Sequence, residues 1–337
     1  MERLKITETY VITVDYNGLK YLPNYFKNIL NQSYNDFKII FVDNSTNNDS
    51  IKFIQKTSLN EIQSKKIIIL KNKANEGFAK ANNQGINKAF EDKTCKYIIC
   101  LNNDTEVHEN FLKELIKTSQ KHENVGSVQS KMIWGIHPNL LDSVGVLYSK
   151  NSFAFNRGSH EPINKYNEEE EIFGTCAGAC LYTRNALEDI KIDNNYFDNE
   201  YFAYFEDIDL ALRLKWAGWN SWYCPTSKVL HFNGGTSKNL NTLPFYLSGR
   251  NQIWTCQKNI PIKFRIKYFI LYLLANIMQI IIHLPHGNTI LKSKYDGCFK
   301  YKNKEWFNKI NKKVEWEEIE KWMVLKWMPN EYFKKYE

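Results

Sequence analysis

A short apolar run that ends in three polar side chains is the first candidate site in the chain. Residues 97–101 form this run, and Asn102, Asn103 and Asp104 follow directly. A run of this length is typical of a buried strand, and open α/β sheets bind ligands at the carboxyl ends of their strands. Taken alone, the triplet is better explained as an ordinary turn, where Asn and Asp are common. Because hard cations prefer oxygen ligands, Asp104 also suits a metal and nucleotide-diphosphate site, which the rest of the chain must support.

Two further strand-like runs end in acidic residues. Residues 10–14 precede Asp15 and residues 37–42 precede Asp43, with helical spacing of apolar residues between the runs. This alternation predicts a mostly parallel sheet with helical crossovers. Since parallel strands end at one edge of a sheet, Asp15, Asp43 and residues 102–104 are expected to share a crevice. Three such clusters together favour a binding site.

Two common nucleotide-binding motifs are missing from the sequence. No Gly-x-Gly-x-x-Gly follows the first strand-like run, and no Gly-x-x-x-x-Gly-Lys-Ser/Thr occurs. These absences argue against a dinucleotide-dependent dehydrogenase and against a P-loop enzyme.

An acidic segment at residues 204–219 could supply a general base. In a helix, Glu206 and Asp209 share one side at i,i+3 spacing, and Asp209 has Arg213 as an i,i+4 partner. Asp207 points about 100° away from Glu206, near the helix N-terminus. It is therefore the carboxylate least committed to local pairing and the first candidate for the base, with Glu206 second. The alternative is that Asp207 only caps the helix.

The ordered set of motifs resembles family 2 glycosyltransferases with the GT-A fold, most closely the rhamnosyltransferase-like branch. The matching segments run in the family's order through residues 9–255 and comprise residues 13–17, 42–45, 75–79, 101–104, 205–210 and 231–236. The sequence departs from many members at Asn102, where an Asp-x-Asp motif would have its first Asp. That position therefore offers no charge.

The resemblance implies a role for each matching residue. Asp43 would accept hydrogen bonds from the nucleobase, Asp15 or its neighbouring backbone would lie beside the same nucleoside, and Asn102 would face the ribose. The nucleotide-binding set is completed by Asn17, Asn75, Gly77 and Asn103.

The same resemblance implies a metal site and places the base. Asp104 and His231 would hold a divalent cation, Mg²⁺ or Mn²⁺, across the diphosphate, where it offsets charge on the leaving group. A histidine alone is more often structural than a metal ligand, but the position of His231 before residues 233–236 favours the ligand. The family match also places the general base at Asp207.

Composition indicates the kind of binding partner and the cellular compartment to expect. The chain has 337 residues and a net charge of +8, which favours anionic partners. Its lysines are scattered, which argues against a nucleic-acid groove. Seven cysteines without a Cys-x-x-Cys pair indicate reduced thiols in a cytoplasmic protein. Residues 1–9 are polar and lack the apolar segment of a signal peptide.

The C-terminal part differs from the rest. Residues 264–284 carry no charge from Tyr268 onward, although Asn276, Gln279 and His283 interrupt the run. A membrane-spanning helix needs about 20 apolar residues, so this one is at the lower limit. Lysines flank it on both sides, and we expect peripheral contact with the inner face of the cell membrane rather than a helix packed on the catalytic domain. The expected division is a catalytic domain at 1–255 and a helical extension at 256–337.

These observations together predict an α/β GT-A protein with a C-terminal helical extension. Its expected activity is that of an inverting, metal-dependent glycosyltransferase. It would move a sugar from a nucleotide diphosphate, of dTDP-rhamnose or UDP-sugar type, to a hydroxyl of a glycan or lipid-linked acceptor in polysaccharide biosynthesis. One alternative is a catalytically silent nucleotide-sugar-binding scaffold on the same fold. A nucleotidyltransferase would require a basic, glycine-rich loop after the first strand, and residues 15–18 do not form one.

Overall fold

The computed structural model describes residues 8–232, 242–282, 287–301 and 306–327. The strands are β1 (Thr9–Asp15), β2 (Phe37–Asp43), β3 (Ile67–Lys71), β4 (Tyr97–Leu101), β5 (Thr105–Val107), β6 (Val125–Trp134), β7 (Leu141–Ser143), β8 (Val146–Tyr148), β9 (Ala154–Asn156), β10 (Glu170–Ile172), β11 (Ala179–Thr183) and β12 (Asn220–His231). The helices are α1 (Leu22–Leu30), α2 (Asp49–Thr57), α3 (Leu59–Gln63), α4 (Phe78–Phe90), α5 (Phe111–Lys121), α6 (Arg184–Ile190), α7 (Glu206–Trp216), α8 (Leu243–Asn259), α9 (Ile262–Lys267), α10 (Phe269–Ile282), α11 (Gly287–Phe299), α12 (Trp306–Lys309) and α13 (Trp316–Glu320). A 3-10 turn spans Asn199–Tyr201.

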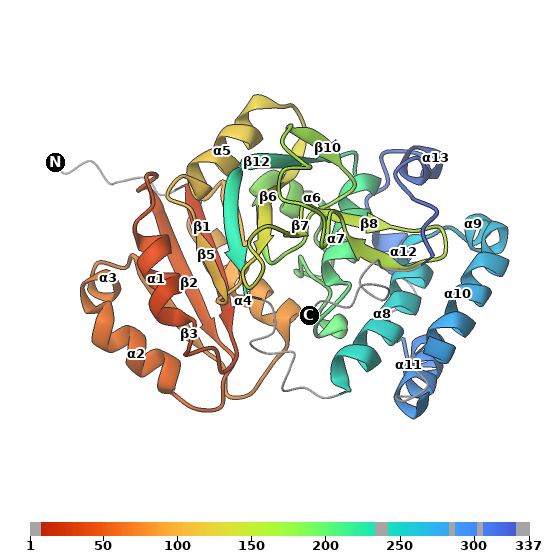
Figure 1. The fold of residues 1–337 in the computed structure, drawn as a ribbon, viewed down its shortest axis with the longest axis horizontal. Helices are drawn as coiled ribbons and strands as arrows, with labels where there is room; N and C mark the ends of the chain where they lie inside the picture. The colour runs from red at the N-terminus through yellow and green to blue at the C-terminus, as the bar shows by residue number, and fades with distance from the viewer. Residues whose placement is uncertain (1–7, 233–241, 283–286, 302–305, 328–337) are drawn as a thin grey trace.

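A single mixed sheet forms the centre of the molecule (Figure 1). Its strand order is β10-β12-β6-β11-β4-β1-β2-β3, with β5 added on β12 and β7 on β6. The four strands β3, β2, β1 and β4 are all parallel, as the alternation of strand and helix patterns predicts. Strand β11 then lies antiparallel between β4 and β6. Strand β12 runs parallel to β6 and carries its last residues to β5.

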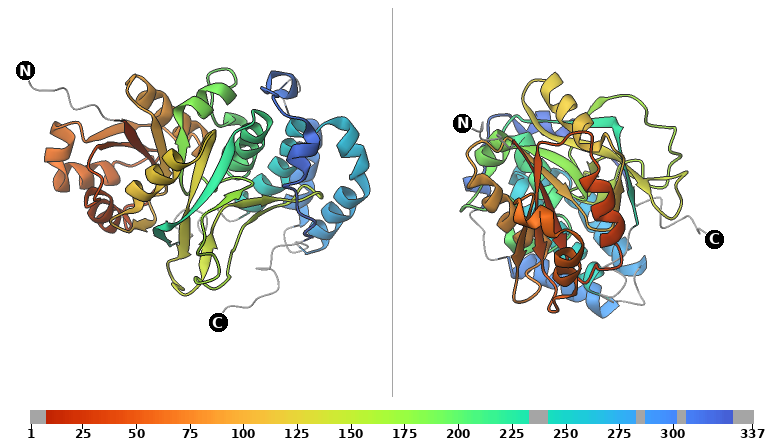
Figure 2. Two further views of the ribbon diagram at one scale, coloured as in Figure 1. Left: turned by 90° about the horizontal axis from the view of Figure 1, so that it is seen from above. Right: turned by 90° about the vertical axis from the view of Figure 1, so that its left-hand side faces the viewer.

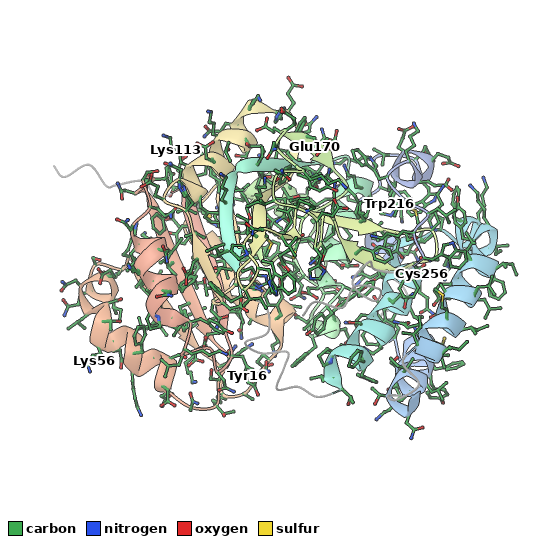
Figure 3. All side chains as sticks on the ribbon, in the orientation of Figure 1. Tyr16, Lys56, Lys113, Glu170, Trp216 and Cys256 are labelled. Carbon is green, nitrogen blue, oxygen red and sulfur yellow. The ribbon has the colours of Figure 1, made fainter. Side chains whose placement is uncertain are left out.

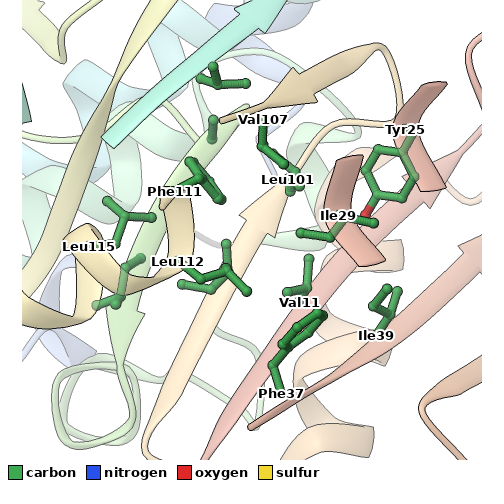
Figure 4. Close-up of a cluster of buried hydrophobic side chains, with 14 of the residues drawn as sticks. Val11, Tyr25, Ile29, Phe37, Ile39, Leu101, Val107, Phe111, Leu112 and Leu115 are labelled. Atoms are coloured by element: carbon green, nitrogen blue, oxygen red, sulfur yellow. The ribbon is translucent and has the colours of Figure 1, made fainter. Parts of the chain in front are cut away.

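The parallel strands are apolar throughout because both faces of the sheet are covered. On one face, Val11, Ile39 and Leu101 pack against α1 and α5, with Ile29 and Leu112 among the contacts (Figure 4). On the opposite face, alternate residues of the same strands pack against α4, α6 and α7. The strand-like runs therefore lack the alternation that a half-exposed sheet would show.

Helix α7 is buried on two sides. Ile208, Leu212 and Trp216 pack toward the C-terminal helices, whereas Leu210 and Leu214 pack toward the sheet. Figure 3 shows Trp216 between these two parts of the molecule. Burial all round makes α7 a rigid support for the residues at its N-terminus.

Helices α8–α11 lie at the end of the molecule opposite α1–α3, as the labels of Figure 1 and the left view of Figure 2 show. Helix α8 packs against α7 and α11. Helix α10, by contrast, buries only Ala275. In the part of the chain that the structure describes, we find no helix with both the length and the apolar character needed to span a bilayer.

Candidate active site

A cavity of about 450 Å³ opens where the parallel strands end. Tyr16, which follows β1, lies in its wall and marks this edge of the sheet in Figure 3. The predicted site residues in the lining are Asn75, Gly77, Asn102, Asn103, Asp104, Glu206, Asp207 and His231. The remaining three predicted residues, Asp15, Asn17 and Asp43, lie beside the cavity and outside its lining.

Asp104 and His231 meet although 126 residues separate them in sequence. The last residues of β12 pair with β5, with His231 opposite Thr105, and the Phe232 N–H donates to the Asp104 carbonyl at 2.9 Å. As a result, His231 Nε2 lies 3.2 Å from Asp104 Oδ1 and 3.4 Å from Asn102 Nδ2. Residues 233–236, the remainder of this motif, lie outside the described residues.

This pair has the geometry of two ligands to one divalent cation. Two octahedral ligands about 2.1 Å from an ion, at right angles, lie about 3.0 Å apart. His231 Nδ1 is 2.8 Å from Asp142 Oδ2, the carboxylate–histidine contact that orients metal-bound imidazoles. No cluster of three His, Cys, Asp or Glu ligands occurs among the described residues. A cation here would therefore draw further ligands from water or a diphosphate, as Mg²⁺ commonly does.

His231 binds a proton tightly when no metal is present. Burial lowers the pKa of the imidazole, but hydrogen bonds and charges from Asp104 and Asp142 outweigh it and raise the pKa to about 10. A cation must displace this proton to bind. Asp142, in β7, was not predicted, because a single Asp in an irregular region has no sequence signature.

Asp15 and Asp43 support the loop that follows β2. Asp15 accepts from Ser50 Oγ at 2.8 Å and from Asn103 Nδ2. Asp43 accepts from the Ser45 N–H at 2.8 Å and pairs with Lys71 Nζ at 2.7 Å. Both carboxylates are fully buried. The three strand ends are thus connected by hydrogen bonds, and each contributes to the cavity wall, through Tyr16, Asn44 and residues 102–104, although Asp15 and Asp43 themselves do not line it.

Asn17 and Gly77 have backbone roles that the structure makes visible. The Asn17 N–H donates to Ser45 Oγ at 2.8 Å, while its side chain is exposed. Gly77 has φ +84°, and a Cβ there would approach the carbonyl oxygen of Phe202 to 2.7 Å. Asn75 Oδ1 accepts from the Gly77 N–H at 3.0 Å. Only glycine allows this close approach of the segment before α4 to the loop before α7.

The two neighbouring carboxyls at the start of α7 differ in ionisation. Burial raises the pKa of Asp207 to about 6, although N–H groups of Ile208 and Ala177 partly offset it. Glu206 is buried, its Oε2 has no hydrogen-bond partner, and burial with the charge of Asp207 raises its pKa well above the usual range. Asp207 can therefore exchange a proton near pH 6, whereas Glu206 favours its protonated form, the kind of separation that assigns acid and base roles.

The comparisons with known proteins concern the family and the fold. The chain belongs to glycosyl transferase family 2, whose model matches residues 10–191. The family and fold predictions are therefore confirmed.

One curated relative has a more specific activity. Over 63 residues the chain is 43% identical to N-acetylglucosaminyl-diphospho-decaprenol L-rhamnosyltransferase of Mycobacterium tuberculosis. That match covers 18% of this chain and 19% of the relative, so it extends over about a fifth of the relative's length.

Two solved structures share the fold. GalNAc-T7 with UDP, GalNAc and Mn²⁺ is similar with a TM-score of 0.60 and 14% identity, over 90% of this chain and 56% of that one. The mannosyltransferase PcManGT from Pyrobaculum calidifontis, with GDP-Man and Mn²⁺, gives a TM-score of 0.52 and 13% identity, over 87% and 75%. At these identities the likeness shows the GT-A fold alone.

Proposed function

We propose that the protein is an inverting, metal-dependent glycosyltransferase. It takes a sugar from a nucleotide diphosphate, of dTDP-rhamnose or UDP-sugar type, to a hydroxyl of a glycan or lipid-linked acceptor in polysaccharide biosynthesis. The observation that supports this most directly is that Asp207 and the Asp104–His231 pair line one cavity. A carboxylate that can take a proton thus shares a space with two groups that can hold the cation of a leaving diphosphate.

The nucleotide would occupy the part of the cavity lined by the predicted polar residues. Asn75, Gly77, Asn102 and Asn103 lie at its wall. Asp15 and Asp43 are fully buried, so we propose that they shape the nucleoside site through Asn103 and the loop that contains Ser45. Asn17 supports the same loop through its backbone.

Asp104 and His231 are the residues that would hold Mg²⁺ or Mn²⁺. When bound, the cation supplies charge neutralisation for the departing nucleotide diphosphate. Asp142 fixes the ring of His231 so that Nε2 is directed to the Asp104 side. The two structurally similar transferases were both solved with Mn²⁺, which supports a divalent cation here.

Asp207 would take the proton of the acceptor hydroxyl. As that oxygen forms its bond to the anomeric carbon, the bond from this carbon to the diphosphate oxygen breaks on the opposite side, so the anomeric configuration inverts. Glu206, protonated beside Asp207, can donate a hydrogen bond to a sugar hydroxyl. A general base contributes about 10²–10⁴-fold to the rate.

A screen of nucleotide sugars for hydrolysis and transfer, with Mg²⁺ or Mn²⁺ and with chelator, tests this proposal. We expect turnover of at least one donor that stops in chelator and returns with added cation. A silent scaffold on the same fold would bind nucleotide sugars without turnover. Equal turnover in chelator would contradict the proposed role of the cation.

We also propose that the C-terminal extension, residues 256–337, holds the protein against the inner face of the cell membrane, with the catalytic domain at 1–255 in the cytoplasm. Of the 17 exposed large hydrophobic side chains among the described residues, 12 lie between Ile262 and Phe299. On α10 the exposed positions Phe269, Ile270, Leu273, Leu274, Ile277 and Ile281 recur at helical spacing. Lys263 and Lys267, just before α10, and Lys292, on α11, are exposed, which suits anionic lipid. Residues 283 and 284 of the predicted segment lie outside the described residues.

Sedimentation with phosphatidylglycerol vesicles tests this contact. The pair of substitutions Ile270→Glu and Leu274→Glu should abolish co-sedimentation without lowering the unfolding midpoint, because both side chains are exposed. Leu59→Glu, at an exposed leucine on α3, is the matched control and should still co-sediment. The proposed membrane contact is wrong if the wild-type protein does not co-sediment with anionic vesicles. It is also wrong if the protein forms a dimer that Ile270→Glu dissociates, because the exposed face of α10 would then be a dimer interface.

A further inference from the structure

The loop that leads into Asp207 has an unusual backbone. Phe202, Tyr204 and Phe205 have φ values of +66°, +67° and +69°. This left-handed region is unfavourable for residues with a Cβ, and bulky side chains rarely occupy it. Three aromatic residues within four positions therefore need an external constraint, and such strain often occurs at functional sites. Because Phe205 is the N-cap of α7, the conformation of this loop decides where Asp207 lies.

Helix α8 supplies that constraint through Asn251. The Asn251 side chain is fully buried, and its Nδ2 donates to the carbonyl oxygens of Tyr201, Ala203 and Tyr204 at 3.0, 2.9 and 2.7 Å. Its Oδ1 accepts from Arg250 Nε at 2.9 Å, which fixes the orientation of the amide. The Asn251 side chain thus donates to three carbonyl groups in residues 201–204, next to and within the left-handed loop formed by residues 202–205.

The same face of α8 also holds the two ends of the segment around this loop. Before the loop, Thr255 Oγ1 lies 2.9 Å from the hydroxyl of Tyr201. After it, Asn259 Nδ2 donates to Asp209 Oδ1 at 2.9 Å. Lys258 Nζ bridges both sides, at 2.9 Å from Asp198 and 2.7 Å from Asp209. Because both ends are fixed, the loop between them cannot relax by shifting α7 as a whole.

We propose that Asn251 is a positioning residue for Asp207, a role that rests on the proposed function of Asp207 as the base. Its amide holds the left-handed loop that directs the Asp207 carboxylate into the cavity. Without these donors the carbonyl groups of Ala203 and Tyr204 would lose a hydrogen-bond partner, whereas the Tyr201 carbonyl would keep Arg250 Nη2 at 3.0 Å. The loop would then relax toward commoner backbone angles and carry Asp207 away from the acceptor. Nucleotide binding, which uses other residues of the cavity, would not change.

Asn251→Asp is the most direct variant because it keeps the shape and removes the donor. The matched control is Asn151→Asp, at a fully buried asparagine whose Nδ2 donates to the Lys326 carbonyl at 3.0 Å. We expect Asn251→Asp to lower kcat at least tenfold, to leave the Kd of UDP or dTDP with Mn²⁺ within twofold, and to move the acid limb of the kcat–pH profile. We expect Asn151→Asp to change the unfolding midpoint and none of these three.

Three further measurements make the test decisive. A crystal structure of Asn251→Asp should show Tyr204 and Phe205 outside the left-handed region, and retention of their φ values would overturn the proposal. If that variant does not fold, Tyr201→Phe removes only the hydroxyl that contacts Thr255, and an unchanged kcat and pH profile there would overturn it. Asp207→Asn separates the two proposals. If Asp207→Asn is inactive while Asn251→Asp is normal, only the positioning role fails, whereas an active Asp207→Asn removes the base assignment itself.

Discussion

Asp207 and Asp209 lie two residues apart on α7 and meet opposite environments. Asp207 faces the cavity, pairs with no Lys or Arg among the described residues, and has a pKa that burial raises to about 6. Asp209 is more deeply buried, yet Lys258 and Arg213, at 2.7 and 2.9 Å, outweigh that burial and hold the pKa of its carboxyl below the usual value. The charged partners, and not the depth of burial, decide which carboxylate can exchange a proton. Asp207 is suited to proton transfer, and Asp209 is suited to fixing the position of helix α7.

The largest expected effect concerns Asp207, the carboxyl group that faces the cavity. Asp207→Asn should lower turnover by about 10²–10⁴-fold, because the variant cannot accept the proton of the acceptor hydroxyl. Its unfolding midpoint should stay the same or rise, since the substitution removes a carboxylate whose ionised form burial disfavours. Initial rates and thermal unfolding check both parts, with Asp49→Asn, at an exposed carboxylate on α2, as control. Near-normal turnover would transfer the base role to Glu206.

For the buried carboxylate Asp209, the expected effect is on the free energy of unfolding. Lys258→Met should lower the free energy of unfolding by about 3–5 kcal/mol, because it removes the buried cation beside Asp198 and leaves Asp209 with Arg213 alone. Since the folded pKa of Asp209 is depressed, its stabilising contribution is present above the unfolded pKa and disappears as pH falls through the folded value. The variant should therefore lose part of the acid sensitivity of unfolding. Lys267→Met, which breaks an exposed pair with Glu320, should cost at most about 1 kcal/mol. If Lys258→Met and Lys267→Met lower the free energy of unfolding equally in denaturant titrations, the buried ion pairs stabilise the protein no more than the surface pair does.

The proposed metal ligands Asp104 and His231 allow a third test of how neighbouring charges set the pKa of a buried group. Asp142→Asn should weaken Mn²⁺ binding about 10–100-fold, because it releases the ring of His231. In the wild type, Mn²⁺ affinity should rise with pH up to about 10, the pKa of His231 without metal, and not level off near 6.5 as an ordinary histidine would. Titration of Mn²⁺ with UDP at several pH values measures this. An affinity that is flat above pH 7 would contradict proton displacement from His231.

The pH dependence of turnover tests the proposed role of Asp207 as the base. A base must be ionised to act, and the folded pKa of Asp207 is raised from 3.8 to about 6. Turnover at saturating donor and metal should therefore be constant above this pH and fall about tenfold per pH unit below it. An acid limb near pH 4 would indicate a base with an ordinary carboxyl pKa and thus a more open site.

The smallest expected effect is at Glu206. Because Glu206 stays protonated, Glu206→Gln keeps a neutral side chain that both donates and accepts, and turnover should fall less than about tenfold. Glu206→Ala removes the hydrogen bond and should raise KM for the sugar substrate more than it lowers kcat. A loss of 10²-fold in Glu206→Gln would contradict the assignment of Glu206 as a neutral neighbour of the base.

The sequence by itself determined the elements and much of the candidate site. The apolar runs before Asp15, Asp43 and Asn102 became the parallel strands β1, β2 and β4, because short apolar runs between turn residues have few other stable forms. Helical geometry alone distinguished Asp207 from Asp209, since i,i+4 pairing with Arg213 is a local property. The ordered motifs identified the family for the same reason, as each motif is a short local segment.

Only the tertiary structure decided how distant residues meet and which groups ionise. His231 reaches Asp104 because β12 adds to β5, and Asp142 completes the contact from a third strand. Asp15 and Asp43 turned out to be buried supports beside the cavity, since the loop after β2 covers them. The left-handed loop before α7 exists because Asn251, some 50 residues later, satisfies its carbonyl groups. Pairing between distant strands, burial and the partners of buried charges depend on long-range contacts, and no local pattern of residues encodes them.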